Sequence, residues 1–358
     1  MNKLKALLAG ESVKISLLSI VLGLLLGAVV MIAGGYNPLL AYQSMLDKIF
    51  GNPYDMAEAL RAIVPLIFTG LAVAIVFRAG MFNIGVDGQI VMGSLGALMV
   101  GNMLSLPPII HAIAAVIAGT LLGGLWGALV AVLKTKRGIN EVISCIMLNW
   151  TALYLSHMVI KAFMAEEGTS RSQNIQESAS IQINWLSELL DGARIHWGFA
   201  LAVVALIAYH FYMNRTKWGY EIRAVGNNNH AARYAGMNVS RVVIRTFFLS
   251  GMLGGMVGTF EVLGVFKYMA IASATSGLGF DGIAVALLGM NGALGVMLAA
   301  ALFGSLMYGA QGMSFGADVP GEVIKMVISI IIFFAAAPGM IRWLLNKTKR
   351  SKQANREG

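Results

Sequence analysis

The stretch from Thr216 to Arg241 is the longest polar interruption between apolar segments that is also rich in arginine and lysine. Very apolar segments lie on both sides of it, at Trp197–Met213 and Val242–Val265. Because a bilayer core is crossed by about 20 helical residues, this stretch is predicted to be a loop between two membrane spans. Its basic residues outnumber the single acid Glu221, and short basic loops stay in the cytoplasm. The loop therefore fixes the orientation of the other spans.

The composition agrees with a polytopic, all-helical membrane protein. Of 358 residues, 58% are hydrophobic and 12% are charged, whereas soluble domains average about 25% charged residues. Of the 26 lysine and arginine residues, 18 lie in four short segments, 1–14, 134–137, 215–245 and 342–356, which is a topology signal and not a nucleic-acid-binding patch. The single cysteine, Cys145, excludes a disulfide framework within the chain.

The apolar segments are predicted to form ten membrane spans. The protein is expected in the plasma membrane, with both termini in the cytoplasm. A basic N-terminus stays inside, Gly34–Leu60 lies outside with an interfacial helix at Ala41–Phe50, and Met164–Ile195 forms a partly ordered outer cap. The predicted spans are Ile15–Ala33, Ala62–Phe77, Ile84–Leu104, Ile110–Leu133, Val142–Phe163, Trp197–Met213, Val242–Val265, Gly277–Met290, Ala293–Gly312 and Val323–Ile341.

A weak internal repeat organises the chain as a single transmembrane domain, 1–358. Residues 82–101 and 279–298 share an aromatic residue and an aspartate in a glycine-rich entry, followed by a small-residue helix. Spans 2–5, about 62–163, would pair with spans 7–10, about 242–341, in opposite orientation, with 214–241 as the cytoplasmic loop. Inverted repeats with substrate at their interface are a recurrent transporter design.

Polar side chains in the third span predict a substrate pathway. The segment GMFNIGVDGQ carries Phe82, Asn83, Asp87 and Gln89, and an aspartate at the bilayer centre costs about 2.5–3.5 kcal/mol. Broken helices occur where the backbone faces protein or a water-filled path. The alternative is that these side chains only bond to neighbouring spans. The corresponding Phe280 and Asp281 in the mirror segment favour the pathway, and Asn149 and Glu261 are further candidates because they lie inside spans.

The chain offers no site for chemistry of its own. It has no G-x-x-x-x-G-K-[ST] phosphate loop and no paired cysteine or histidine spacing for a metal. No cofactor is therefore expected on this chain, and active transport would draw its energy from ATP and Mg²⁺ used by a partner. The alternative is an ion-coupled secondary transporter with Asp87, Asp281 or Glu261 as proton or sodium sites. An intramembrane enzyme would need a convergent catalytic constellation, which the sequence lacks.

The basic loop also has internal form. Asn227 to Asn229 offer N-cap oxygens, Ala231–Ala235 is predicted to be a short helix, and Gly236 is a natural stop. A capped helix with small residues on one side suits docking into a groove on another protein. A solvated basic loop would explain the charges, but not the small-residue helix with its one tyrosine.

The run GYEIRAVGNNNHAARYAGMN resembles the coupling loop of ABC importer permeases for branched-chain amino acids, ribose and nucleosides. Together with FNIGVDGQ, NEVISCIMLNW and GFDGIAVALLG, it is similar to the longer permease subunit of bacterial guanosine-type importers. The resemblance implies the ten-span, vitamin B12 importer-type (type II) fold and inward nucleoside transport; ribose or another sugar is the alternative substrate. It also implies a second related permease chain, an ABC ATPase and a lipid-anchored substrate-binding protein. The residues it assigns to ATPase coupling are Arg223, Asn227, Ala231, Ala232, Arg233, Tyr234, Ala235 and Gly236.

Overall fold

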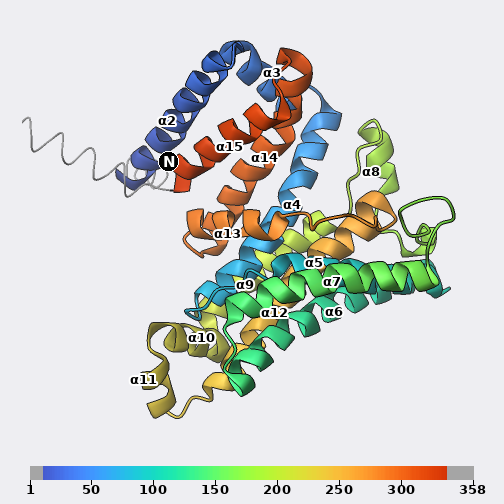
Figure 1. Cartoon of the computed structure of the whole chain (residues 1–358), viewed down its shortest axis with the longest axis vertical. Coiled ribbons are helices and arrows are strands. Elements are labelled where there is room, and N and C mark those ends of the chain that lie inside the picture. The colour runs from blue at the N-terminus through green and yellow to red at the C-terminus, as the bar shows by residue number, and fades with distance from the viewer. Residues whose placement is uncertain (1–10, 337–358) are drawn as a thin grey trace, which may run out of the picture. The chain divides into compact units, whose positions relative to one another are not determined.

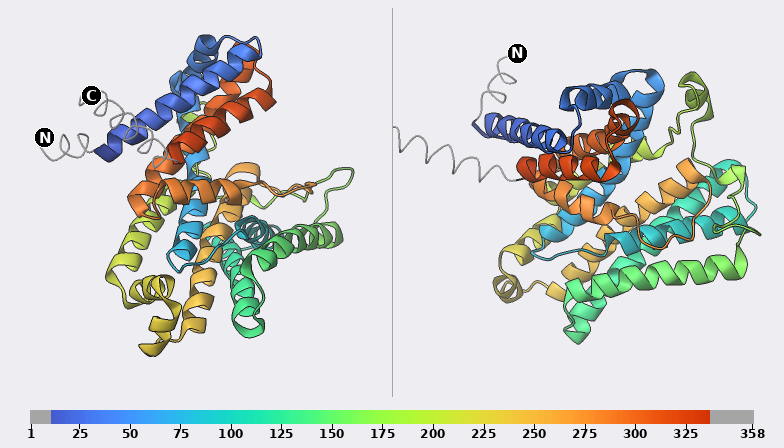
Figure 2. Two further views of the ribbon diagram at one scale, coloured as in Figure 1. Left: turned by 60° about the vertical axis from the view of Figure 1, so that its left-hand side comes forward. Right: turned by 45° about the horizontal axis from the view of Figure 1, so that its top comes forward.

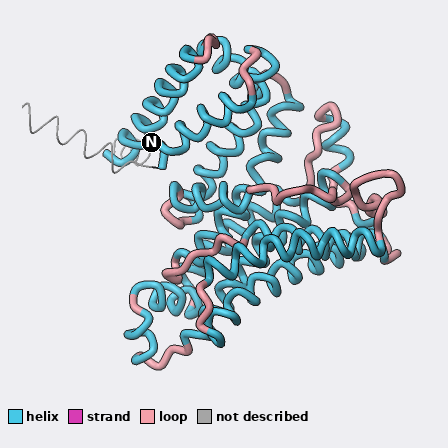
Figure 3. The backbone as a smooth tube through the Cα atoms, in the orientation of Figure 1, coloured by secondary structure: helices cyan, strands magenta, loops and turns pink. Residues whose placement is uncertain are grey.

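The computed structural model describes residues 11–336, and within that range the chain is helical, with isolated β-bridges and no strand (Figure 3). The basic residues before position 11, the end of the tenth predicted span and the basic tail lie outside the described residues. The elements are α2 Glu11–Ala33, α3 Pro38–Phe50, α4 Pro53–Phe77, α5 Val86–Met103, α6 Pro108–Arg137, α7 Glu141–Phe163, η1 Glu177–Ala179, α8 Asn184–Leu189, α9 Gly198–Arg215, α10 Lys217–Asn227, α11 Asn229–Tyr234, α12 Val239–Phe260, the π-helix η2 Glu261–Phe266, α13 Leu278–Leu288, α14 Ala293–Ala317 and α15 Gly321–Ala336.

The described residues divide into two compact units, one formed by those up to Asn52 with those from Leu306 onward, the other by Pro53–Ser305. In the first unit α2 runs beside α15 (Figure 1), and a Cβ on Gly23 would lie 2.7 Å from the Ile331 Cα. The Tyr42 hydroxyl of α3 donates to the Leu24 carbonyl at 2.7 Å. The helix expected at Ala41–Phe50 is present as α3 and begins three residues earlier, because the Asn37 side chain caps it.

The second unit is built on close packing of α5, α6 and α12, which lie side by side in all views (Figures 1 and 2). Glycines make this approach possible. A Cβ on Gly93 would lie 2.2 Å from the Gly255 carbonyl oxygen, and one on Gly123 would lie 2.5 Å from the Gly255 Cα. Small residues allow membrane helices to bring their backbones together, and that closeness replaces the hydrophobic driving force absent in lipid. The three helices form the frame on which the polar segment after α4 rests.

Five described helices are long and apolar enough to cross a membrane: α4, α6, α7, α12 with η2, and α14. The chain is therefore a multi-pass membrane protein. The other predicted spans coincide with α2, α5, α9, α13 and α15, which are helical but shorter or less apolar in their described parts. The count of ten spans stays a prediction.

The helix that contains the second predicted span, Ala62–Phe77, begins nine residues earlier than that span, because α4 starts at Pro53. Glu58 is buried inside this helix. Its carboxylate accepts from Arg61 at 2.8 Å and from the Arg194 side chain at 2.8 Å. Acidic residues at the start of α4 disfavour a buried helix when the sequence is considered alone. The ion pairs with the two arginines offset the desolvation cost of Glu58, so it can be buried within the helix.

Candidate translocation site and coupling segment

The segment between α4 and α5, residues 80–85, is a break in the helical path that is held by side-chain amides. Asn83 is buried; its Nδ2 donates to Ser250 Oγ at 2.8 Å, and its Oδ1 accepts from the Gly85 N–H at 2.9 Å. Gln89 lies within 3.3 Å of the same amide. Ser250 in turn donates to the Ala72 carbonyl. These bonds tie the break to α4, α5 and α12.

Asn149 supports the same break from α7. Its Oδ1 accepts from the Gly88 N–H at 2.8 Å, and its Nδ2 donates to the Ile84 carbonyl at 3.0 Å. The free backbone groups of a broken membrane helix must be satisfied by neighbouring groups, and Asn149 satisfies two of them. In this conformation the amides of Asn83, Gln89 and Asn149 therefore bind the chain itself, as the alternative interpretation of these residues describes.

Asp87 differs from these amides because it joins the two segments that resemble one another. It lies in the first turn of α5 and is 1% exposed. Its Oδ1 accepts from the Gly279 N–H at 3.2 Å, at the start of the mirror segment, and from Ser276 Oγ at 3.4 Å, three residues before it. Its Oδ2 has no hydrogen-bond partner in the described part of the chain. The helix dipole favours an anion here, and the second oxygen remains available for a further donor.

The neighbouring predicted residues are more open. Phe82 and Phe280 are exposed, and the Phe82 ring packs edge-on against Phe77 with centroids 4.7 Å apart. Asp281 is partly exposed in the first turn of α13. Glu261 lies at the far end of α12 and lines a cavity to which Ser276, the donor to Asp87, also belongs. The structure thus brings Asp87, Asp281 and Glu261 into one region of the second unit.

In the basic loop, α11 has the form expected from the sequence. The Asn228 side chain accepts from the Ala231 N–H at 3.0 Å and caps the helix. At the other end the Gly236 N–H donates to the Arg233 carbonyl and the Met237 N–H to the Ala232 carbonyl, with Gly236 at φ +81°. This is the paired bonding of a Schellman motif. The helix spans Asn229–Tyr234, two residues earlier than predicted at its start.

The exposed residues of α11 and of the turn that follows it are Asn229, His230, Ala231, Arg233, Tyr234, Ala235 and Gly236, and Tyr234 is 94% exposed. Ala232 is 4% exposed and packs inside the chain. Its assignment to a partner contact does not fit this position, because the helix turns that side chain inward.

A family model described as branched-chain amino acid transport system / permease component matches residues 56–337. The chain belongs to this family. It is 42% identical over 341 residues to the guanosine ABC transporter permease protein of Bacillus subtilis, with 95% of this chain and 97% of the relative covered. A nucleoside ABC transporter permease protein of Lactococcus lactis is 35% identical, covering 96% and 95%. A glucose ABC transporter permease protein of Haloferax volcanii is 31% identical, covering 88% and 85%.

The basic loop contains a second helix, α10, where a loop is predicted from the sequence. Its N-cap is Thr216, whose side chain accepts from the Gly219 N–H at 3.1 Å. Glu221 pairs with Arg245 of α12 at 2.8 Å, and the Arg245 guanidinium lies 5.1 Å from the centre of the Trp218 ring. The buried Ile222 and Val225, three residues apart, are the pattern that predicts such a helix.

The end of α10 touches the segment that leads to Asn83. A Cβ on Gly226 would lie 2.2 Å from the Arg78 carbonyl oxygen, and Gly80 has φ +71° with its missing Cβ 3.0 Å from the Gly226 carbonyl. Only glycine permits this backbone approach. The two polar regions of the permease, at the basic loop and at Asp87, are therefore linked by direct contact between backbones. Arg223 and Asn227 belong to the same helix, with Arg223 half-buried and Asn227 exposed.

Proposed function

We propose that this permease is the membrane-spanning subunit of an ABC importer that carries nucleosides inward, with purine nucleosides such as guanosine preferred. The observation that carries the proposal is the 42% identity, over nearly the whole of both chains, to a guanosine permease. The similarity to a nucleoside permease supports the same substrate class, and that to a glucose permease is lower at 31%. A sugar substrate is the second candidate, favoured by that relative alone.

In this proposal α11 is the coupling helix and docks into a cleft of the partner ATPase, which uses ATP and Mg²⁺. The exposed Tyr234 and Arg233 contact the partner, while Ala232 and the Asn228 and Gly236 caps hold the helix in shape. Arg223 and Asn227 extend the contact along α10. Movement of α11 could be transmitted through α10, since the end of α10 packs against the backbone of Arg78 and Gly80.

The proposal includes the finer architecture implied by the family resemblance. Ten spans in the type II, vitamin B12 importer-type arrangement, built from inverted repeats, would place both termini in the cytoplasm. A second, related permease chain would complete the translocation path, and a lipid-anchored binding protein would deliver the nucleoside from outside. The contact of Asp87 with Gly279 supports the repeat, because it brings the starts of the two similar segments together.

The test is transport by the purified complex of this permease with its partner subunits in proteoliposomes. We expect guanosine to accumulate only when ATP is supplied on the cytoplasmic side, with inhibition by excess nucleosides and not by ribose or glucose. Inhibition by the sugars alone would show that the substrate is a sugar and not a nucleoside. Uptake that needs no ATP and collapses with an ion gradient would instead establish the secondary transporter.

A further inference from the structure

A cavity of about 350 Å³ lies beside η2 in the second unit of the chain. Its walls come from α5, from α7 at Leu153, from η2 and from the segment that follows η2. The 22 residues of α12 separate this cavity from α11, which at 1.5 Å per residue is about 33 Å. That distance matches the roughly 30 Å core of a bilayer. With α11 at the cytoplasmic face, the cavity lies at the outer face.

The lining of the cavity suits a flat, mostly apolar ring. It is built mainly from aliphatic side chains, with Phe266 and Tyr268 as aromatic walls whose ring centroids are 6.2 Å apart. Few polar side chains reach it, among them Ser94, Glu261 and Ser276. Small-molecule sites are cavities of about 300–1,000 Å³ with this mixture of apolar walls and few polar groups. A bare sugar would need many more hydrogen-bonding groups than these walls supply.

Glu261 is the charged group of the cavity, and its carboxylate has no hydrogen-bond partner among residues 11–336. Arg61 and Arg194 are the bases near it, and both are paired with Glu58. An ionised carboxylate only accepts hydrogen bonds, at both oxygens. It therefore recognises a ligand edge that presents two adjacent N–H donors, as the N1–H and 2-amino group of guanine do. Adenine presents a ring acceptor beside its amino group and offers only one.

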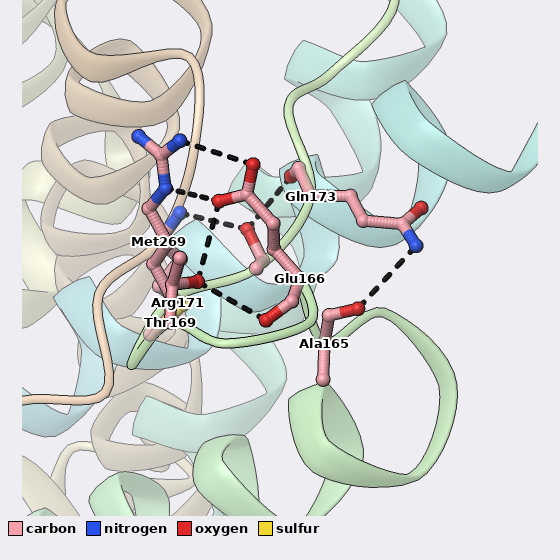
Figure 4. Close-up of polar contacts among 7 residues, drawn as sticks. Ala165, Glu166, Thr169, Arg171, Gln173 and Met269 are labelled. Atoms are coloured by element: carbon pink, nitrogen blue, oxygen red, sulfur yellow. Dashed lines mark hydrogen bonds and ion pairs between the residues drawn. The ribbon is translucent and has the colours of Figure 1, made fainter.

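The outer cap holds the Tyr268 wall in place. The Arg171 guanidinium lies 4.6 Å from the centre of the Tyr268 ring and is itself fixed by a two-pronged ion pair with Glu166 (Figure 4). The backbones are also joined, since the Ser172 N–H donates to the Met269 carbonyl at 2.9 Å and the Ile271 N–H to the Ser170 carbonyl at 2.9 Å. Arg171 lowers the pKa of Glu166, which keeps this clamp charged at neutral pH.

We propose that this cavity is the outer nucleobase site of the permease, where Glu261 accepts the paired N–H donors of guanine and Tyr268, clamped by Arg171, stacks on the ring. The inference rests on the proposed function and adds to it the residue that selects the base. Ser276 donates to Asp87, so the floor of the site continues directly to the first turn of α5, next to the polar segment between α4 and α5. A nucleoside seated here would lie at the entrance of that path.

The test compares Glu261→Gln with the wild type in proteoliposomes that contain the complete complex, using guanosine and adenosine as competing substrates. The amide replaces one of the two accepting oxygens with an NH2 donor. It cannot accept two adjacent N–H donors side by side, so we expect the preference for guanosine over adenosine to fall roughly tenfold or more, as for loss of one bidentate base contact. Glu188→Gln, which removes an exposed outer carboxylate, should leave the preference unchanged. An unchanged preference in Glu261→Gln would overturn the site while wild-type guanosine uptake still upheld the proposed function.

A second measurement decides the matter if Glu261→Gln assembles poorly. Thr275→Cys places a thiol in the cavity lining, and Thr169→Cys places one on the exposed cap, both in a Cys145→Ala chain that retains uptake. Guanosine should slow maleimide labelling of Thr275→Cys and not of Thr169→Cys, and adenosine should protect less. Equal labelling with and without guanosine would overturn the cavity as the nucleobase site. Absence of any nucleoside uptake by the wild-type complex would instead remove the proposed function.

Discussion

The helix α11 and the broken segment between α4 and α5 are both polar, yet they are held in opposite ways. The caps of α11 are bonds between residues three to five apart, at Asn228, Gly236 and Met237. The broken segment is bonded to partners far along the chain, from Asn149, 65 residues after Ile84, to Ser250, 167 residues after Asn83. The shape of α11 is therefore set by its own neighbours in sequence, whereas the shape of the broken segment depends on how other helices pack around it.

The largest expected effect is a difference in thermal stability between two matched substitutions, one in each region. Asn149→Ala leaves the buried Gly88 N–H and Ile84 carbonyl unpaired, and each unsatisfied group costs about 1–3 kcal/mol. Asn228→Ala removes one cap, at about 1 kcal/mol and only locally. We expect a clear loss of thermal stability in detergent for Asn149→Ala and little for Asn228→Ala. Equal melting temperatures would show that the broken segment is not part of the frame.

The next prediction concerns the contact between the two regions. In Gly226→Ala the new methyl group meets the Arg78 carbonyl, and overpacking costs about 1–3 kcal/mol. The end of α10 should move away from the segment before Asn83, so more ATP should be hydrolysed per nucleoside imported. Gly321→Ala is the control, because a Cβ there meets nothing within 4 Å. An unchanged ratio of ATP hydrolysed to guanosine imported, in an assembled Gly226→Ala complex, would argue against transmission through this contact.

A smaller change in stability is expected on the exposed face of α11. Tyr234→Ala touches no buried group, and surface substitutions stay within about ±0.5 kcal/mol. The permease should fold normally but bind its ATPase less tightly, as co-purification of the two would measure. Ala232→Trp should behave differently, because Ala232 faces the chain's own interior, and should lower stability before it affects docking. Normal ATPase binding by Tyr234→Ala would show that this face of α11 does not contact the ATPase.

The smallest effect is a pH dependence at the outer cap. The pKa of Glu166 is depressed by Arg171, so the clamp contributes fully above the ordinary pKa of a glutamate and is lost as pH falls through the lowered value. Both side chains are partly exposed to solvent, which keeps the contribution small. Hydrogen exchange of residues 165–172, compared with Glu166→Gln at each pH, should differ from that variant at neutral pH and converge with it only in strong acid. Identical exchange in the wild type and Glu166→Gln at neutral pH would show that the Glu166–Arg171 pair does not stabilise the cap.

The segments that the sequence located well are those whose partners are close in the chain. Ala41–Phe50 reads as a helix on its own residues, and Asn228 with Gly236 specifies both ends of α11 within nine residues. The long apolar helices α6 and α7 are likewise defined by their length and composition. Local rules failed where a distant partner changed the outcome. The start of α4 was missed because Glu58 is stabilised by Arg194, 136 residues away.

By itself, the sequence determined that this chain is a membrane protein, where its charged loops lie and that one loop carries a capped helix, because apolar length, charge and capping are local properties. Only the tertiary structure decided that Ala232 faces inward, that Asn83 and Asn149 bond to the chain's own backbone, and that Glu261 shares a cavity with Tyr268. Each of these depends on which helices pack together, and glycines such as Gly93 and Gly255 set that packing through contacts between distant segments.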